Sequence, residues 1–171
     1  MAIRLLVLDL DETLIYATET NLAHKPEWSF NEYVIYPRPH LNYFLQYCIA
    51  NFEIGVWSSA GESYVSFITH KIFNDISMLK FIWSGKQCIN KSTGIQNIKD
   101  LRKLRRFGFL TDEIIILVDS PEKVCRQSKN LLQISPFDGN LNDCELLKII
   151  EKIESKKMTA NPNSTFCPLS G

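Results

Sequence analysis

Two aspartates, one residue apart, follow an apolar run near the start of the chain, in the stretch VLDLDETL at residues 7–14. Two carboxylates this close repel each other, which costs free energy unless a positive charge offsets the repulsion. Mg²⁺ is a suitable counter-charge because it prefers carboxylate, carbonyl and water oxygens as ligands. Asp9, Asp11 and the distant Asp119 are therefore candidate metal ligands, Asp11 through its backbone carbonyl.

The same residue types could carry out phosphoryl transfer. Asp9 is the candidate nucleophile, because a carboxylate can attack phosphorus and form an aspartyl-phosphate. Asp11 shares a face with Asp9 on a strand, so it is placed to protonate the leaving oxygen and later to activate water. A hydroxyl and a lysine ammonium can hold phosphate oxygens. The candidate phosphate-binding residues are Thr13, Ser58, Ser59 and Lys99.

Taken singly, each of these residues has an ordinary structural explanation. A D-x-D pair is often a turn, and a serine after a strand is more often a helix cap than a ligand. Lys99 by itself suits a solvated helix, and Asp119 before Ser120 and Pro121 could begin a helix. Their joint order along the chain favours a shared site over these separate explanations.

The expected order of elements shows how such distant residues could meet. Apolar and β-branched runs predict five strands, at residues 3–10, 52–57, 80–83, 113–119 and 130–134. Helical periodicity predicts four helices, of which the first three lie at 39–52, from about 62 to Ile76, and at 98–108, where Gly108 ends the helix. The fourth begins at a capping box formed by Asn142 and Glu145. Its inner face is formed by Leu146, Ile150 and Ile153.

This alternation predicts an α/β fold, with a Rossmann-like, mostly parallel sheet and helices on both faces. Ligands of such sheets bind beyond the carboxyl ends of the strands, and the candidate residues at 9–11, 58–59 and 119 lie at or just after the ends of predicted strands. Between them, residues 16–36 are expected to form a loop with at most a short hairpin. Its aromatic side chains could line the site or simply pack on the core.

Composition narrows the class of protein. The 171 residues fit one domain, which we place at 1–156, with a flexible tail at 157–171. Basic and acidic residues balance at 19 each, so no overall field favours nucleic acid or an anionic membrane. The apolar runs are too short to span a bilayer. Five scattered cysteines are typical of a reducing compartment, so we expect a cytoplasmic location, or a nuclear one in a eukaryote.

Four stretches together resemble the motifs of the haloacid dehalogenase (HAD) superfamily of phosphotransferases. LDLDETL resembles the first motif, and IKDLRKL and IIILVDSPEKV resemble the third and fourth. The run YVIYPRPHLNYFLQYCIANFEIGVWSSAGESYV is similar to the NIF-type, or C-terminal-domain small phosphatase (FCP homology), branch up to its second motif. The similarity extends from about Ile3 to about Ile153.

The resemblance implies a role for each matching residue. Asp9 matches the nucleophile of the family and Asp11 its acid and base, while Ser58 stands where the family binds phosphate. Lys99 matches the lysine that stabilises phosphate, and Asp119 matches a Mg²⁺ ligand. The resemblance also implies an HAD-like fold with a small insert and no large cap.

Three departures from the family pattern stand out. Val118 occupies a position where the fourth motif commonly has an acid, which leaves Asp119 as its side-chain ligand. The second motif reads WSSA, in which Ser58 keeps the hydroxyl. The stretch between the first motif and RPH is shorter than in the small phosphatases, so their inserted sheet is expected to be trimmed.

We therefore expect a Mg²⁺-dependent phosphatase with an open site, acting on phosphoserine or phosphothreonine in a protein or peptide. Direct binding to nucleic acid or to a membrane is not expected. Two alternatives stay open: an HAD phosphatase of small molecules, and a binding module that keeps the fold without catalysis. The presence of Asp9, Asp11, Lys99 and Asp119 together argues against the second.

Overall fold

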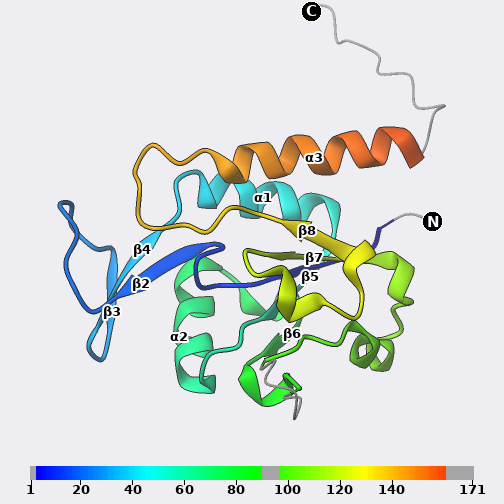
Figure 1. The fold of residues 1–171 in the computed structure, drawn as a ribbon, viewed down its shortest axis with the longest axis horizontal. Coiled ribbons are helices and arrows are strands. Elements are labelled where there is room, and N and C mark those ends of the chain that lie inside the picture. Colours follow the sequence, from blue (N-terminus) through cyan, green and yellow to red (C-terminus); the bar gives the residue numbers. More distant parts are fainter. Residues whose placement is uncertain (1–2, 90–96, 161–171) are drawn as a thin grey trace, which may run out of the picture.

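The computed structural model describes residues 3–89 and 97–160, without the side chains of 156–160. Its centre is a parallel sheet of five strands in the order β6-β5-β1-β7-β8 (Figure 1). The strands are β1 (Leu5–Leu8), β5 (Glu53–Trp57), β6 (Leu79–Trp83), β7 (Ile114–Val118) and β8 (Leu131–Gln133). The five predicted strands and the α/β class are thus confirmed.

The two faces of the sheet are covered by different kinds of helix. Leu6 and Leu8 of β1 belong to a core cluster with the α-helices α1 (Leu41–Asn51), α2 (Glu62–Ile72) and α3 (Glu145–Ala160). Leu5 and Val7 belong to a second cluster, with the 3₁₀ helices η3 (Leu101–Phe107) and η5 (Pro121–Val124). Strand β1 is apolar throughout because it is buried on both faces. None of the described helices combines the length and the apolar character needed to span a bilayer.

The basic helix expected at 98–108 forms as the 3₁₀ helix η3, not as an α-helix. Leu101 and Leu104 are both fully buried against the sheet. Residues three apart lie on the same side of a 3₁₀ helix, so this winding turns both leucines inward. Asp100 caps the first turn by accepting from the N–H of Arg102 at 3.2 Å. Gly108 ends the helix in the left-handed region, at φ 82°, as predicted.

Residues 16–36 contain the short hairpin that their residues suggest and the small insert that the resemblance implies, but also one strand more than expected. The chain forms a three-stranded antiparallel sheet from β2 (Ile15–Thr18), β3 (Trp28–Phe30) and β4 (Tyr33–Pro37), in the order β2-β4-β3. Ile35 and Tyr36 of the central strand are both buried, and because successive strand residues point to opposite faces, β4 is covered on both faces at this point. Figure 1 shows this inserted sheet beyond the end of β1, beside the carboxyl edge of the central sheet.

Two helix ends also differ from expectation. Helix α2 ends at Ile72, and Ile76 begins a separate 3₁₀ turn, η1 (Ile76–Met78), because the side chain of Asp75 accepts from the N–H of Ser77 and caps a new helix there. Helix α3 continues to Ala160, four residues into the segment expected to be a flexible tail. The rest of that predicted tail, 161–171, lies outside the described residues.

The expected capping box at the start of α3 is absent. Asp143 is the cap, since its Oδ1 accepts from the N–H of Glu145 at 3.0 Å, whereas Asn142 donates its own N–H to the side chain of Asn140. The buried face of α3 consists of Leu146, Ile149 and Ile153, with the expected Ile150 only half-buried. Asp143 takes the capping position in place of Asn142, and its carboxylate also accepts hydrogen bonds from a buried arginine.

That arginine is Arg38, which follows β4 and is almost completely buried. Its Nε and Nη2 each donate to one oxygen of Asp143 at 2.8 Å. Nη1 donates to the carbonyl of Thr13 at 3.0 Å, and Nη2 also donates to the carbonyl of Ser135 at 2.9 Å. Arg38 therefore joins the end of the inserted sheet, the turn after β1 and the start of α3. Its planar guanidinium can donate to Asp143 and to the carbonyls of Thr13 and Ser135 at the same time.

Arg38→Met is expected to lower the free energy of unfolding by about 3–5 kcal/mol, because it leaves Asp143 and two carbonyls without their donor. Urea denaturation at neutral pH measures the change.

Burial alone would raise the pKa of Asp143, but the bonds from Arg38 and from Glu145 hold that pKa below its usual value. This stabilisation is therefore present at neutral pH and is lost as the pH falls through that lowered pKa.

Arg105→Met is the matched control, since Arg105 is exposed on η3 and the same change there should stay within about 0.5 kcal/mol. Equal effects of the two substitutions would show that the buried arginine is not a structural tie.

Candidate active site

The candidate residues follow the carboxyl ends of three neighbouring strands. Leu8 pairs with Val56 of β5 on one side and with Leu117 of β7 on the other. The segments that carry Asp9, Ser58 and Asp119 therefore leave the sheet side by side, as predicted. Their closeness follows from the strand order alone.

Asp9 and Lys99 form a buried ion pair at this edge. Asp9 Oδ2 contacts Lys99 Nζ, and the two side chains are 3% and 0% exposed. Asp9 Oδ1 accepts from the backbone N–H of Leu10 at 2.9 Å. Within the described part of the chain, neither Oδ2 nor Nζ has a well-aligned hydrogen bond, so both atoms are buried with capacity for a further polar partner.

The sequence had indicated that Lys99 lies at the start of the basic helix, but in the structure it does not. It precedes η3 and is fixed by its backbone N–H, which donates to the carbonyl of Lys123 at 2.7 Å. The helix cap is Asp100, whose Oδ2 is 2.6 Å from both Arg102 and Arg126. Lys99 is thus aimed into the site from a short segment held on both sides, and not from a solvated helix face.

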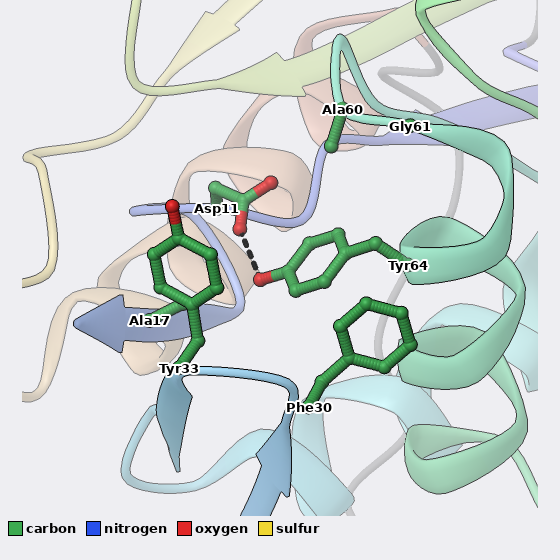
Figure 2. A pocket seen from close by; sticks show the side chains of 7 residues that line it. All are labelled: Asp11, Ala17, Phe30, Tyr33, Ala60, Gly61 and Tyr64. Atoms are coloured by element: carbon green, nitrogen blue, oxygen red, sulfur yellow. Dashed lines mark hydrogen bonds between the residues drawn. The ribbon is translucent and has the colours of Figure 1, made fainter. Parts of the chain in front are cut away.

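Asp11 has hydroxyl partners in place of a cation. Oδ1 accepts from Tyr64 Oη at 2.5 Å (Figure 2). Oδ2 accepts from Ser58 Oγ at 3.3 Å. Burial raises the pKa of Asp11 above its ordinary value, and the charge of Asp9 raises it further, against the opposing effect of the two hydroxyls. A raised pKa suits a carboxyl that must deliver a proton.

Thr13 and Ser120 hold Asp119 in place. Thr13 Oγ1 donates to Asp119 Oδ1 at 3.3 Å and accepts from the backbone N–H of Asp119 at 3.2 Å. Ser120 Oγ donates to Oδ2 at 2.6 Å. Thr13 reaches this position because Glu12 has a φ of 57°, which turns the chain sharply after Asp11. The predicted contact of Thr13 with phosphate is untested, and its buried hydroxyl is engaged with Asp119.

The two serines after β5 differ in their surroundings. Ser58 is fully buried, and its Oγ accepts from the N–H of Ala60 at 3.0 Å while it donates to Asp11. It is therefore both the turn-forming residue of the ordinary explanation and a member of the site. Ser59 is half-buried at the same turn. Gly85 packs closely against its backbone, since a Cβ on Gly85 would lie only 2.5 Å from the Ser59 carbonyl oxygen.

The donor set is compatible with a hard divalent cation. Asp9 and Asp119 are buried carboxylates on adjacent segments, and Oδ2 of Asp9 lacks a hydrogen bond among the described residues. Val118 is buried in the apolar cluster that contains β7 and offers no side-chain oxygen. No group of three or more acidic, histidine or cysteine side chains in the described ranges forms a ready metal cage. A partial oxygen set suits Mg²⁺, which usually keeps several waters.

An aromatic pocket of about 320 Å³ opens beside Asp11. Figure 2 shows Phe30 and Tyr33 extending from the inserted sheet, with the ring of Tyr64 from α2 lying between them in this view. The full lining is Asp11, Ala17, Phe30, Tyr33, Ala60, Gly61 and Tyr64. The other aromatics of the insert pack on the protein itself: Trp28 lies against the core cluster, and the buried Tyr36 accepts from the N–H of Leu22. Both explanations left open for this aromatic segment therefore apply, each to part of it.

Sequence reasoning missed Tyr64, the residue in closest contact with Asp11. It lies 53 positions away along the chain, and the sequence shows only an aromatic residue in the first turn of a helix. No pattern of spacing could have linked the two.

Comparisons with known proteins agree with this geometry. A family model described as NLI interacting factor-like phosphatase matches residues 4–162. The chain is 29% identical over 180 residues to CTD phosphatase-like protein 355R of Invertebrate iridescent virus 3, a match that covers 90% of this chain and 97% of that protein. It is 30% identical over 145 residues to the mitochondrial import inner membrane translocase subunit TIM50 of Kluyveromyces lactis, covering 83% of this chain and 28% of that one.

Solved structures share the fold. Fcp1, described as an essential RNA polymerase II CTD phosphatase, has a TM-score of 0.61 at 17% identity, and the match covers 97% of this chain but 55% of that chain. A HAD-superfamily hydrolase of Geobacter sulfurreducens PCA has a TM-score of 0.55 at 12% identity, covering 88% of this chain and 100% of that chain. The HAD-like, Rossmann-type architecture is thus confirmed.

The buried lysine provides a test of the site's electrostatics. Lys99→Met should lower the free energy of unfolding by about 3–5 kcal/mol in the absence of metal, because Asp9 would stay buried without its cation. Added Mg²⁺ stabilises the protein because it binds only the folded site. It should raise the melting temperature more in this variant than in the wild type, because Lys99 no longer offsets the charge of Asp9. Thermal denaturation with EDTA or Mg²⁺ measures both effects.

Lys129→Met is the control, because Lys129 is exposed and its loss should change stability by no more than about 0.5 kcal/mol. A loss at Lys99 as small as at Lys129 would contradict a buried charge pair.

Proposed function

The chain belongs to the NLI interacting factor-like phosphatases of the HAD superfamily, and on that premise we propose that it hydrolyses phosphomonoesters through a phosphorylated Asp9. The observation that carries the proposal is the buried contact between Asp9 and Lys99 at the carboxyl edge of the sheet. A carboxylate held next to an ammonium group, with an unoccupied hydrogen-bonding capacity, is suited to meet a phosphoryl group there.

In the first step, a carboxylate oxygen of Asp9 attacks phosphorus while the bond to the leaving oxygen breaks. Asp11 gives its proton to that oxygen, and its raised pKa favours the protonated form that this step needs. Lys99 holds one phosphoryl oxygen, and Ser58 would hold another by turning its single hydroxyl proton away from Asp11 while Asp11 is protonated. A Mg²⁺ ion bound by Asp9, Asp119 and the carbonyl of Asp11 would supply positive charge against the phosphoryl oxygens.

In the second step, Asp11, now ionised, takes a proton from water, and the water oxygen attacks phosphorus. The bond between Asp9 and phosphorus breaks, inorganic phosphate leaves, and both carboxyls return to their first state. Tyr64 and Ser58 donate to Asp11 in the structure, which suits the ionised form that acts as base. One carboxyl therefore serves as acid and then as base.

For the substrate we propose phosphoserine or phosphothreonine in a protein or peptide. The pocket beside Asp11 supports this, because it offers apolar walls next to the leaving group, where the neighbouring residues of a peptide would lie. A relative named as CTD phosphatase-like is compatible with the same class. Binding to nucleic acid or to a membrane forms no part of the proposal, and a cytoplasmic or nuclear location accords with the scattered cysteines.

A second candidate is a binding module without catalysis, because the chain is also similar to TIM50, which is named as a subunit of a translocase. Hydrolysis of an aryl phosphate with and without Mg²⁺ separates the two, since a binding module would show no turnover in either condition. A third candidate is a phosphatase of small metabolites. A panel of phosphopeptides and phosphorylated metabolites compares it directly with the protein phosphatase.

Asp9 and Asp11 should fail in different ways when each is replaced by asparagine. Asp9→Asn is expected to abolish turnover, because no nucleophile remains. Asp11→Asn should release one burst of aryl alcohol and then stall, since an amide cannot act as the base for hydrolysis. Intact-protein mass spectrometry after acid quench should then show a species about 80 Da heavier, the mass of one retained phosphoryl group.

The matched control is Asp112→Asn, an exposed aspartate in η4 (Thr111–Glu113), which should turn over at the wild-type rate with no stable adduct. The proposal is wrong if Asp9→Asn remains active, or if peptide mapping places the added mass on a residue other than Asp9.

A further inference from the structure

Tyr64 connects the aromatic pocket to the candidate acid and base. It extends from the first turn of α2, lines the pocket, and donates from Oη to Asp11 Oδ1 at 2.5 Å (Figure 2). The other carboxyl oxygen accepts from Ser58 Oγ at 3.3 Å. With one hydroxyl on each oxygen, the carboxyl plane is held from two directions. Free rotation of the carboxyl would break one of these bonds.

The ring of Tyr64 is itself held by the inserted sheet. Phe30 of β3 meets it edge to face, with ring centroids 5.5 Å apart and planes at 78°. Phe30 in turn lies against Phe67 of α2, at 5.1 Å between centroids. Aromatic pairs of this geometry are attractive beyond simple burial. A continuous line of contacts therefore runs from the inserted sheet through Phe30 and Tyr64 to Asp11.

We propose that Tyr64 is a positioning residue, which holds the Asp11 carboxyl toward the leaving oxygen, and that the inserted sheet supports it through Phe30. This inference rests on the proposed phosphatase function, with Asp11 as its acid. A tyrosine hydroxyl suits the task because it can keep donating to one oxygen of the carboxyl while the other oxygen gives or takes the proton. The same contact can thus keep Asp11 in place through both steps.

The test compares substrates that need a general acid to different degrees. Tyr64→Phe removes the hydroxyl and keeps the ring. Values of kcat/KM are measured with Mg²⁺ for a series of substituted phenyl phosphates whose leaving groups grow more basic. The poorest leaving groups depend most on protonation, so the loss in Tyr64→Phe should grow along the series and reach on the order of tenfold at its end. For Asp11→Asn, which stalls after one turnover, the rate constant of the burst should show a still steeper dependence.

Tyr33→Phe is the matched control, because it removes the hydroxyl of the other tyrosine in the pocket wall. It should leave the dependence on the leaving group as in the wild type, whatever its effect on overall rate. Phe30→Leu should steepen the dependence in the same direction as Tyr64→Phe, but by less. Thermal denaturation of each variant checks that the fold is intact.

A loss in Tyr64→Phe that is the same for every leaving group would overturn the positioning role, as would a profile equal to that of Tyr33→Phe. The underlying phosphatase proposal fails in a different way, through a wild type without Mg²⁺-dependent turnover or an active Asp9→Asn. That result would overturn both proposals at once.

Discussion

The burial of several carboxylates at one edge of the sheet is the constraint on which the rest of the structure depends. Asp9 and Asp119 are almost completely buried, and Asp11 follows Asp9 by two residues. Removing a charge from water is costly unless it gains a partner. Each carboxylate here has different compensation: Lys99 for Asp9, the hydroxyls of Thr13 and Ser120 for Asp119, and those of Tyr64 and Ser58 for Asp11.

These compensating groups require most of the fold to be in place. Lys99 arrives from the segment before η3, and Tyr64 from α2. The turn after β1 contains a non-glycine residue in the left-handed region, Glu12, which costs about 1 kcal/mol or more. Arg38 binds the carbonyl of Thr13 in this turn and is anchored to Asp143. The inserted sheet and α3 thereby help to hold the loop that carries the acids.

Sequence reasoning could predict the central sheet from local patterns, and the meeting of the acids from the rule that parallel strands share one carboxyl edge. Long apolar runs mark buried strands, and parallel strands bring residues that follow their ends to one edge. The residues of the insert predicted only a short hairpin and not its three strands, because β2 and β3 have only four and three residues and are separated by a polar stretch. The winding of η3 depends on which leucines must face the sheet, a requirement set by tertiary packing.

The partners of the site residues could not be predicted for a related reason. Arg38 and Asp143 are 105 positions apart, and Thr13 and Asp119 are 106 apart. Nothing local in an arginine after a strand, or in a threonine within a turn, indicates which distant group it will meet. Hydrogen-bond partners of this kind exist only once the strand order has been established, so they follow from the fold and do not precede it.

The different partners of Asp9 and Asp11 also account for how two carboxyls one residue apart could have separate tasks. Asp9 contacts a buried ammonium group, which stabilises negative charge where a nucleophile needs it. Asp11 has no cation within its described contacts, and burial with the nearby charge of Asp9 raises its pKa. Pairs of carboxyls whose surroundings differ in this way are typical of acid–base division of labour. The position of Lys99 on one side of the site, and of Tyr64 on the other, is therefore what distinguishes the two aspartates.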